Sequence, residues 1–224
     1  MQNPWTSLPT RAPYLLASDE NAVMQFNASA EDIHKIRYEL RPEPFLGRID
    51  AEIILLNLNP GFSEDDHLLY EQEYAQSIWK KNILHEPLEY PFFLLDPQLS
   101  GFPGPKWWVR HLKEPIQVAS KDVQTVANKI CCIEFFPYHS RRYAWKGGIL
   151  ESQKYSFHLA ELAVERDAVI IVMRGAEQWY EAVPKLSTHK RKFELNSKQN
   201  VVISKGNCPE GFPHVERILK ASGS

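Results

Sequence analysis

The segment IILLNLNPGF, residues 53–62, joins a short apolar run directly to a polar turn. Apart from Asn57, its first six residues are apolar, and they do not alternate with polar residues as those of a half-exposed strand do. Continuous apolar runs of this length are typical of parallel strands that are covered on both faces. The segment therefore predicts a buried strand over residues 53–58 that ends in the turn at residues 59–61.

Three further apolar runs occupy residues 130–136, 168–173 and 201–204. Four helical patterns lie between or after the runs. The first begins at Ser63, and the second has an apolar face that includes Phe157. The third spans residues 176–183, and the fourth begins at Pro213. Alternating strands and helices indicate right-handed parallel crossovers. We expect one domain over residues 1–224, an α/β three-layer sandwich with a central four-stranded parallel sheet and helices on both faces.

Two segments fit this pattern less well. Residues 86–124 contain eight prolines and glycines, which argues against a long regular element, and aromatic residues that would keep the segment packed. We interpret it as an ordered insertion over the edge or mouth of the sheet. Residues 31–40 are expected to form a helix.

Composition limits the class of protein. The 26 Lys and Arg residues nearly balance the 28 Asp and Glu residues, so any contact with DNA needs a local positive surface. The amino terminus lacks the pattern of a signal peptide, and no apolar stretch approaches the ~20 residues that span a bilayer. Three cysteines, Cys131, Cys132 and Cys208, are too few for an iron–sulfur site and lack a zinc spacing. We therefore expect a cytoplasmic protein with no metal, no other cofactor and no membrane partner.

Polar groups follow all four apolar runs, at the points where the predicted strands end. The first run leads to Asn59, the second contains Glu134 and leads to Arg141 and Arg142, the third leads to Arg174, and the fourth to the segment 205–209. Ligands bind at the carboxyl ends of parallel strands, because loops and helix starts meet there. The sequence therefore predicts that Asn59, Glu134, Arg174 and Asn207 border one site.

Each of these motifs also has a structural interpretation. Asn-Pro-Gly is a common turn, since proline fixes φ and glycine accepts positive φ. Glu134 is costly to bury unless it is functional or forms a salt bridge, for which Arg174 is the main rival explanation. The segment 138–146 mixes basic and aromatic residues, which suits phosphate contact and base stacking, but a solvated loop is equally consistent.

The chain resembles the uracil-DNA glycosylase superfamily, in particular a bacterial-type branch of it. The resemblance is most specific from about residue 42 to residue 62, where RPEPFLG (residues 41–47) is followed by LLNLNPGF (residues 55–62). It continues through residues 134–142, 149–153, 173–179 and 204–209. It implies that the first motif, with Pro60, Gly61 and Phe62, lies at the mouth of a base pocket and that Asn59 positions the attacking water. It further implies that an aromatic side chain stacks on the flipped base, with Phe93 the first candidate and Phe62 the second.

Two positions depart from the superfamily's pattern. Glu134 stands where an asparagine commonly reads uracil through its amide, and Asn207-Cys208-Pro209 replaces a motif that begins with histidine. An ionised carboxylate offers only acceptors, so we expect a poor uracil excisor whose pocket suits an amine-bearing base. If burial raises the pKa of Glu134, the protonated acid could instead donate to a carbonyl.

The resemblance implies a metal-independent N-glycosidase that acts on a flipped, non-uracil base in DNA, with Glu134 reading or polarising the base. Asn207, Lys205, Arg141 and Arg142 would then hold the phosphates of the flipped nucleotide, with Arg174 in the same basic group. Two alternatives belong to other classes. One is a non-catalytic protein that binds single strands, modified bases or nucleotides, and the other is a small-molecule hydrolase that uses the same crevice.

Overall fold

A computed structural model describes residues 1–221, and these contain a mixed five-stranded sheet beside helices. The sheet order is β1-β3-β2-β4-β5, and all neighbouring strands are parallel except β1, which pairs antiparallel with β3. The α/β class is therefore confirmed, and the sheet is mixed, with three of the four expected strands in its parallel part. The strands are β1 Phe45–Leu46, β2 Ile53–Asn57, β3 Ile130–Glu134, β4 Val169–Val172 and β5 Lys192–Glu194.

The three central strands are the three longest apolar runs of the sequence. Every residue of β2, β3 and β4 is buried, which explains why none of these runs alternates with polar residues. Their register places Ile53 opposite both Ile130 and Val169, and Asn57 opposite Glu134. The last residues of β2 and β3 are thus polar partners at the same end of the sheet.

The prediction of a strand over residues 201–204 is wrong. This stretch is extended but unpaired in the sheet; the backbone N–H of Ile203 donates to the carbonyl of His111, 2.9 Å away, at the end of a helix. Val201 and Ile203 are buried, although the stretch pairs with no strand. The fourth parallel strand is β5, whose residues are half-buried or exposed because it lies at the sheet edge, so it gives no apolar run.

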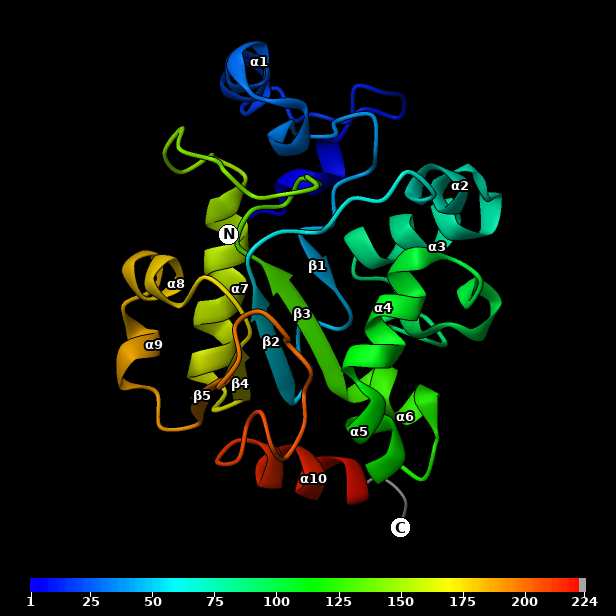
Figure 1. Cartoon of the computed structure of the whole chain (residues 1–224), viewed down its shortest axis with the longest axis vertical. Helices are drawn as coiled ribbons and strands as arrows, with labels where there is room; N and C mark the ends of the chain where they lie inside the picture. The colour runs from blue at the N-terminus through cyan, green and yellow to red at the C-terminus, as the bar shows by residue number, and fades with distance from the viewer. Residues whose placement is uncertain (222–224) are drawn as a thin grey trace.

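Figure 1 shows α7, α8 and α9 on one side of the sheet and α3 to α6 on the other. The expected helices after β3 and β4 and at the carboxyl end are present as α7, α8 and α10, while the helix after Ser63 is split in two at Gln72. The helices are α1 Glu20–Ser29, α2 Asp66–Glu71, α3 Glu73–Ile83, α4 Pro103–His111, α5 Lys113–Val118, α6 Val123–Lys129, α7 Gln153–Glu165, α8 Ala176–Ala182, α9 Lys185–Thr188 and α10 Phe212–Lys220. No helix of residues 1–221 is long and apolar enough to cross a membrane.

The insertion over residues 86–124 is more regular than its composition indicates. Prolines lie in the first turns of α4 and α5, where the missing N–H costs no helical hydrogen bond. Both helices therefore form, and α6 follows them. Trp108 packs edge-on against Phe92 with ring centres 4.8 Å apart. The insertion is therefore a packed helical layer.

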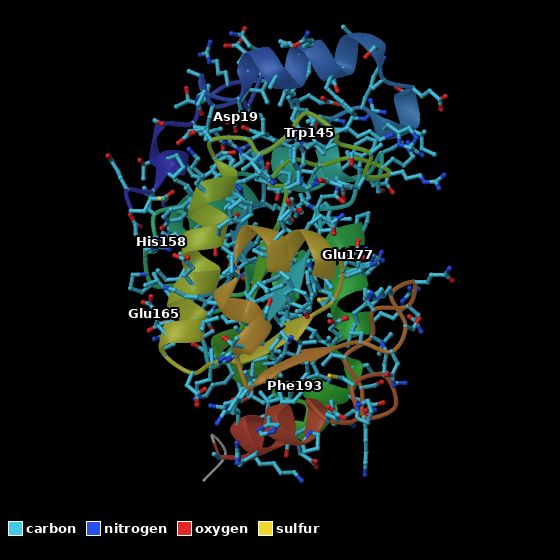
Figure 2. The ribbon with its side chains drawn as sticks, turned by 90° about the vertical axis from the view of Figure 1, so that its left-hand side faces the viewer. Asp19, Trp145, His158, Glu165, Glu177 and Phe193 are labelled. Carbon is cyan, nitrogen blue, oxygen red and sulfur yellow. The ribbon has the colours of Figure 1, made fainter. Side chains whose placement is uncertain are left out.

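The amino-terminal segment is anchored to the loop that follows β3. The Tyr138 hydroxyl donates to Asp19 over 2.8 Å and accepts from the backbone N–H of Leu16. Figure 2 shows Asp19 in the upper part of the molecule, close to α1. The helix expected over residues 31–40 is wrong: the segment forms one 3-10 turn at Asp32–His34 and then an isolated antiparallel bridge from Ile36 to Ser140.

The side chain of Asn82 from α3 forms hydrogen bonds to the outer edge of strand β1. Its Nδ2 donates to the carbonyl of Phe45 at 2.9 Å, and its Oδ1 accepts from the N–H of Gly47 at 3.0 Å. The amide thus occupies the place of a further strand. Gly47 itself has φ +104°, and a Cβ there would lie 2.6 Å from the carbonyl oxygen of Ile130.

We expect Gly47→Ala to lower the free energy of unfolding by ~2 kcal/mol or more, because it combines backbone strain with a clash against a core strand. Urea unfolding measures this difference. Gly101→Ala is the matched control, since no atom lies within 4 Å of a Cβ at that exposed position. Equal stability of the two variants would contradict this description of the β1 edge.

Candidate functional site

A cavity of about 230 Å³ opens at the carboxyl ends of β2, β3 and β4. Asn57 and Glu134 line it from the strand ends, and Arg174 from the loop after β4. The turn at residues 59–61 and Phe62 form one wall, while Trp107 and Trp108 of α4 form another. Of the four residues predicted to border one site, Asn59, Glu134 and Arg174 line this cavity and Asn207 does not.

A buried hydrogen bond joins the two strand ends at this cavity. Nδ2 of Asn57 donates to Oε1 of Glu134 over 3.0 Å, and only 4% and 2% of the two residues are exposed. The Sγ of Cys132 lies 3.6 Å from the same Oε1. The other oxygens of the pair, Oε2 of Glu134 and Oδ1 of Asn57, are buried and have no hydrogen-bond partner within residues 1–221.

Burial raises the pKa of Glu134 to about 8, and the negative charge of Glu43 acts in the same direction. The hydrogen bonds from Asn57 and Cys132 and the positive charge of Arg174 oppose this shift. Below pH 8 the acid is therefore mostly protonated. Among residues 1–221 no ion pair within 4.0 Å joins Glu134 to Arg174, so the predicted rival, a structural salt bridge, is not formed.

A second polar group lines the cavity beside this pair. The Tyr70 hydroxyl donates to Oε1 of Glu43, which also lies 4.0 Å from Nε2 of His139. All three side chains are at least nine-tenths buried. Burial raises the pKa of Glu43, and the positive charge of His139 partly offsets this. With Asp66, which also lines the cavity and is buried, the cavity has three buried carboxyl groups.

His139 and Ser140 hold the turn that carries Asn59. The two ring nitrogens of His139 face the carbonyls of Gly61 and Arg41 at 2.6 and 3.0 Å. Nδ2 of Asn59 donates to Ser140 Oγ at 3.0 Å and to the carbonyl of Pro60 at 2.8 Å. These contacts leave Oδ1 of Asn59 as the atom that can accept from a ligand or water.

Phe62 lies at the rim between two guanidinium groups. The Cζ atoms of Arg37 and Arg141 are 4.7 and 5.4 Å from its ring centre. Arg141 also forms an ion pair with Glu64, and Arg37 one with Asp32. Two guanidinium groups therefore contact Phe62 beside the cavity, and nearby acids reduce the local positive charge.

Other predicted site residues lie elsewhere. Phe93 is completely buried in the 3-10 turn Phe93–Leu95 and does not line the cavity. The aromatic side chains of the lining include Phe62, Trp107 and Trp108. The side chain of Asn207 is absent from the lining and is used within its own loop: Nδ2 donates to the carbonyls of Asn200 and Val202, and Oδ1 accepts from the N–H of Ser197. Arg141, Arg142 and Lys205 are also outside the lining.

Sequence reasoning missed Glu43, Tyr70, Asp66 and the two tryptophans of α4. Glu43 could have been identified, because it is the one acid of the motif RPEPFLG that also carries the family resemblance. The sequence pattern indicates only a packing role for Trp107 and Trp108, as aromatic residues of the insertion. Their place at the cavity depends on how the insertion folds over the sheet, which no local pattern specifies.

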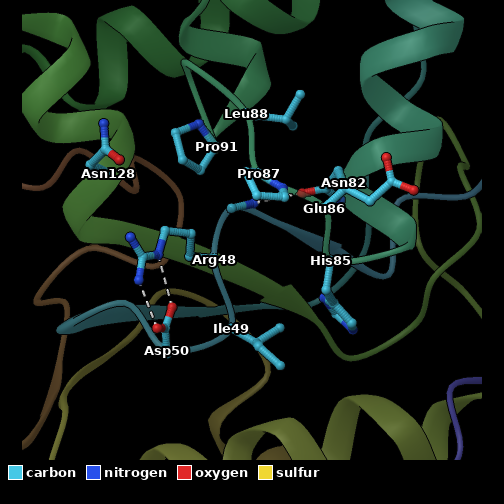
Figure 3. Close-up of a pocket in the computed structure, with 11 residues that line it drawn as sticks. Arg48, Ile49, Asp50, Asn82, His85, Glu86, Pro87, Leu88, Pro91 and Asn128 are labelled. Carbon is cyan, nitrogen blue, oxygen red and sulfur yellow. Dashed lines mark hydrogen bonds and ion pairs between the residues drawn. The ribbon is translucent and has the colours of Figure 1, made fainter.

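A second cavity, of about 510 Å³, lies outside the β1 edge (Figure 3). It is lined by residues that include Arg48, Asp50, Asn82 and His85. Arg48 is already paired with Asp50 over 2.7 Å, and Asn82 closes the edge of β1. His85 stacks on Phe45 with ring centres 4.8 Å apart. Arg48, Asn82 and His85 are therefore already engaged by other groups, and the cavity at the strand ends is the better candidate site.

No grouping of three or more His, Cys, Asp or Glu side chains within residues 1–221 could hold a metal ion. No protein-family model, no curated protein and no solved structure matches this chain. The resemblance to the uracil-DNA glycosylase superfamily therefore stays a prediction.

The raised pKa of Glu134 predicts a pH-dependent stability. Between pH 4.5 and 8 the folded state keeps a proton that the unfolded state releases, so stability falls as pH rises, by ~1.4 kcal/mol per pH unit for this group. We expect Glu134→Gln to lack this contribution, and urea unfolding at pH 5 and pH 8 measures it. Glu177→Gln, at an exposed position of α8, serves as the control and should follow the wild type. A Glu134→Gln variant with the wild-type pH profile would contradict the assignment.

Proposed function

We propose that the chain binds a single heterocyclic base in the cavity at the strand ends and hydrolyses its N-glycosidic bond without a metal. The substrate is a flipped, non-uracil base in DNA. One observation carries this proposal: the buried Asn57–Glu134 pair keeps two unpartnered oxygens at a cavity whose mouth holds Asn59. Buried polar atoms without partners are rare, and at a concave site they point to a ligand.

The size and lining of the cavity support a small planar ligand. Its 230 Å³ is below the ~300 Å³ at which pockets for drug-sized molecules begin. Trp107 lines the cavity with one ring face stacked on His111, so its other face can stack on a base, and base–aromatic stacking contributes ~1–3 kcal/mol per base. A single nucleobase fits this combination of polar groups and aromatic walls, and removing a base from the helix stack is how proteins bring it to such a pocket.

In the proposed reaction, Oδ1 of Asn59 orients a water molecule toward the sugar carbon. The amide is too weak a base to deprotonate the water. The base must therefore depart before the water loses its proton. Glu134 faces the base through Oε2 and can polarise it by hydrogen bonding as it leaves. As the glycosidic bond breaks, its electron pair goes to the base. The water then adds to the sugar, and the proton that it releases goes to the departed base.

A second candidate function is binding without hydrolysis, and Asn207 favours it. In the superfamily that the sequence resembles, the last motif supplies a histidine to the reaction; here every polar side-chain atom of Asn207 bonds within the loop. The cavity then retains its base-reading pair and lacks one electrophilic group. Such a protein would bind a base or nucleotide and leave its bond intact.

The test of hydrolysis is a panel of oligonucleotides that carry different damaged bases, treated with alkali to reveal abasic sites. We expect strand breaks for a non-uracil base. Asn59→Ala should lower the rate by at least about 100-fold, since the water is no longer oriented, and should leave base binding intact. Asn128→Ala, at the second cavity, is the matched control. Binding without breaks for any base would favour the second candidate and exclude the first.

Binding to DNA phosphates is expected to involve a small basic surface with Arg141, Arg142 and Lys205. Replacing all three with alanine should reduce the slope of log affinity against log salt by ~1 unit for each phosphate that is no longer neutralised, measured by fluorescence anisotropy. Lys185→Ala, Lys190→Ala and Lys198→Ala together make the same charge change elsewhere and should leave the slope unaltered. An identical slope in both triple variants would identify the first group as ordinary solvated surface.

A further inference from the structure

The two unpartnered oxygens of the cavity belong to neighbouring strand ends. Oδ1 of Asn57 can only accept a hydrogen bond, and Oε2 of Glu134 accepts when the group is ionised. The two residues are register partners and are already joined through Nδ2 and Oε1. A ligand that satisfies both oxygens must therefore bring two donors that lie side by side.

The polar neighbours of Glu134 mostly favour its carboxylate form. Asn57 and Cys132 donate to Oε1, and Arg174 places a positive charge nearby; among the charged groups around it, Glu43 is the one that opposes ionisation. The main remaining obstacle is the removal of water on burial. A ligand that donates a hydrogen bond to Oε2 replaces that solvation and so stabilises the carboxylate. The described residues supply no such donor at Oε2.

Arg174 provides a donor at the same cavity. Its half-buried side chain lines the cavity, and within residues 1–221 its guanidinium forms no hydrogen bond or ion pair. It follows β4, the strand beside β2 on the side away from β3. The three strands thus present a donor, an acceptor and a second acceptor in the order Arg174, Asn57, Glu134.

We propose that this row reads the edge of a 2-amino lactam, the arrangement found in guanine and in damaged guanines that keep that edge. The ring carbonyl accepts from Arg174, the ring N–H donates to Oδ1 of Asn57, and the exocyclic amine donates to Oε2 of Glu134. The inference rests on the proposed function, because it names the base class that the same cavity takes. Adenine lacks the lactam, and an imide such as uracil places a carbonyl against the carboxylate.

The protonation state of Glu134 distinguishes the binding of a 2-amino lactam from the binding of an imide. With a pKa of about 8 in the empty cavity, Glu134 must lose its proton to accept from the amine, so a 2-amino lactam binds with proton release and binds more weakly as pH falls below 8. An imide needs the protonated acid as a donor. It binds without proton release and loses affinity above pH 8.

The experiment is calorimetric titration of the wild-type chain with guanosine, inosine and uridine at pH 6, 7 and 8. Two buffers of different ionisation heat measure proton release at each pH. We expect guanosine to bind about 10- to 100-fold more tightly than inosine, which differs only in lacking the amine. Affinity for guanosine should rise about tenfold per pH unit up to pH 8. Equal affinities for guanosine and inosine, or tighter binding of uridine without proton release, would refute the proposal.

A variant gives the matched control. Glu134→Gln preserves the shape of the side chain but cannot ionise, so guanosine binding should weaken and lose both its pH dependence and its proton release. Retention of either feature would show that another group titrates. The oligonucleotide assay distinguishes the two proposals: guanosine binding with proton release but no base excision would exclude hydrolysis alone. Excision of a base without the amino lactam edge, with no guanosine binding, would exclude the edge assignment alone.

Discussion

The hydrogen bond between Asn57 and Glu134 is the constraint on which the candidate site depends. It connects the ends of the two central strands at a point where both side chains are almost completely buried. Burying a carboxyl group in this way is costly unless its oxygens find partners, and the chain supplies donors to only one of them. The cavity therefore contains a carboxyl group that burial keeps protonated near neutral pH. A ligand that donates a hydrogen bond to this group can shift it to the ionised form.

The surrounding structure holds this pair and its cavity in place. Parallel pairing of β2 with both β3 and β4 fixes the register of the strand ends, and the insertion covers them with α4. His139 and Ser140, which follow β3, hold the turn that follows β2. Consecutive strands thereby fix each other's loops, so Asn59 has a defined position relative to Glu134. An active site requires such preorganisation of groups that come from separate segments.

The central part of the fold follows from sequence because its strands are covered on both faces and give continuous apolar runs. The edge strands do not: β5 is half-exposed and polar, and β1 has two residues, closed by a side chain from α3. The run at residues 201–204 is apolar for another reason, the burial of Val201 and Ile203 outside the sheet. For the site, position after a strand end was enough to identify Asn59, Glu134 and Arg174. Asn57 was overlooked inside its own strand, and Glu43 and Trp107 reach the cavity through tertiary packing that no local pattern specifies.

Direct titration of the Glu134 carboxyl is the most decisive measurement. Carbon-13 NMR of the side-chain carboxyl, assigned by comparison with Glu134→Gln, reports its protonation in the empty protein and with guanosine bound. We expect a midpoint near pH 8 without ligand, because burial outweighs the donors on Oε1, and a lower midpoint with guanosine. A midpoint near 4.5 in the empty protein, unchanged by guanosine, would show that burial does not hold the proton on Glu134 and that the cavity does not read the amine.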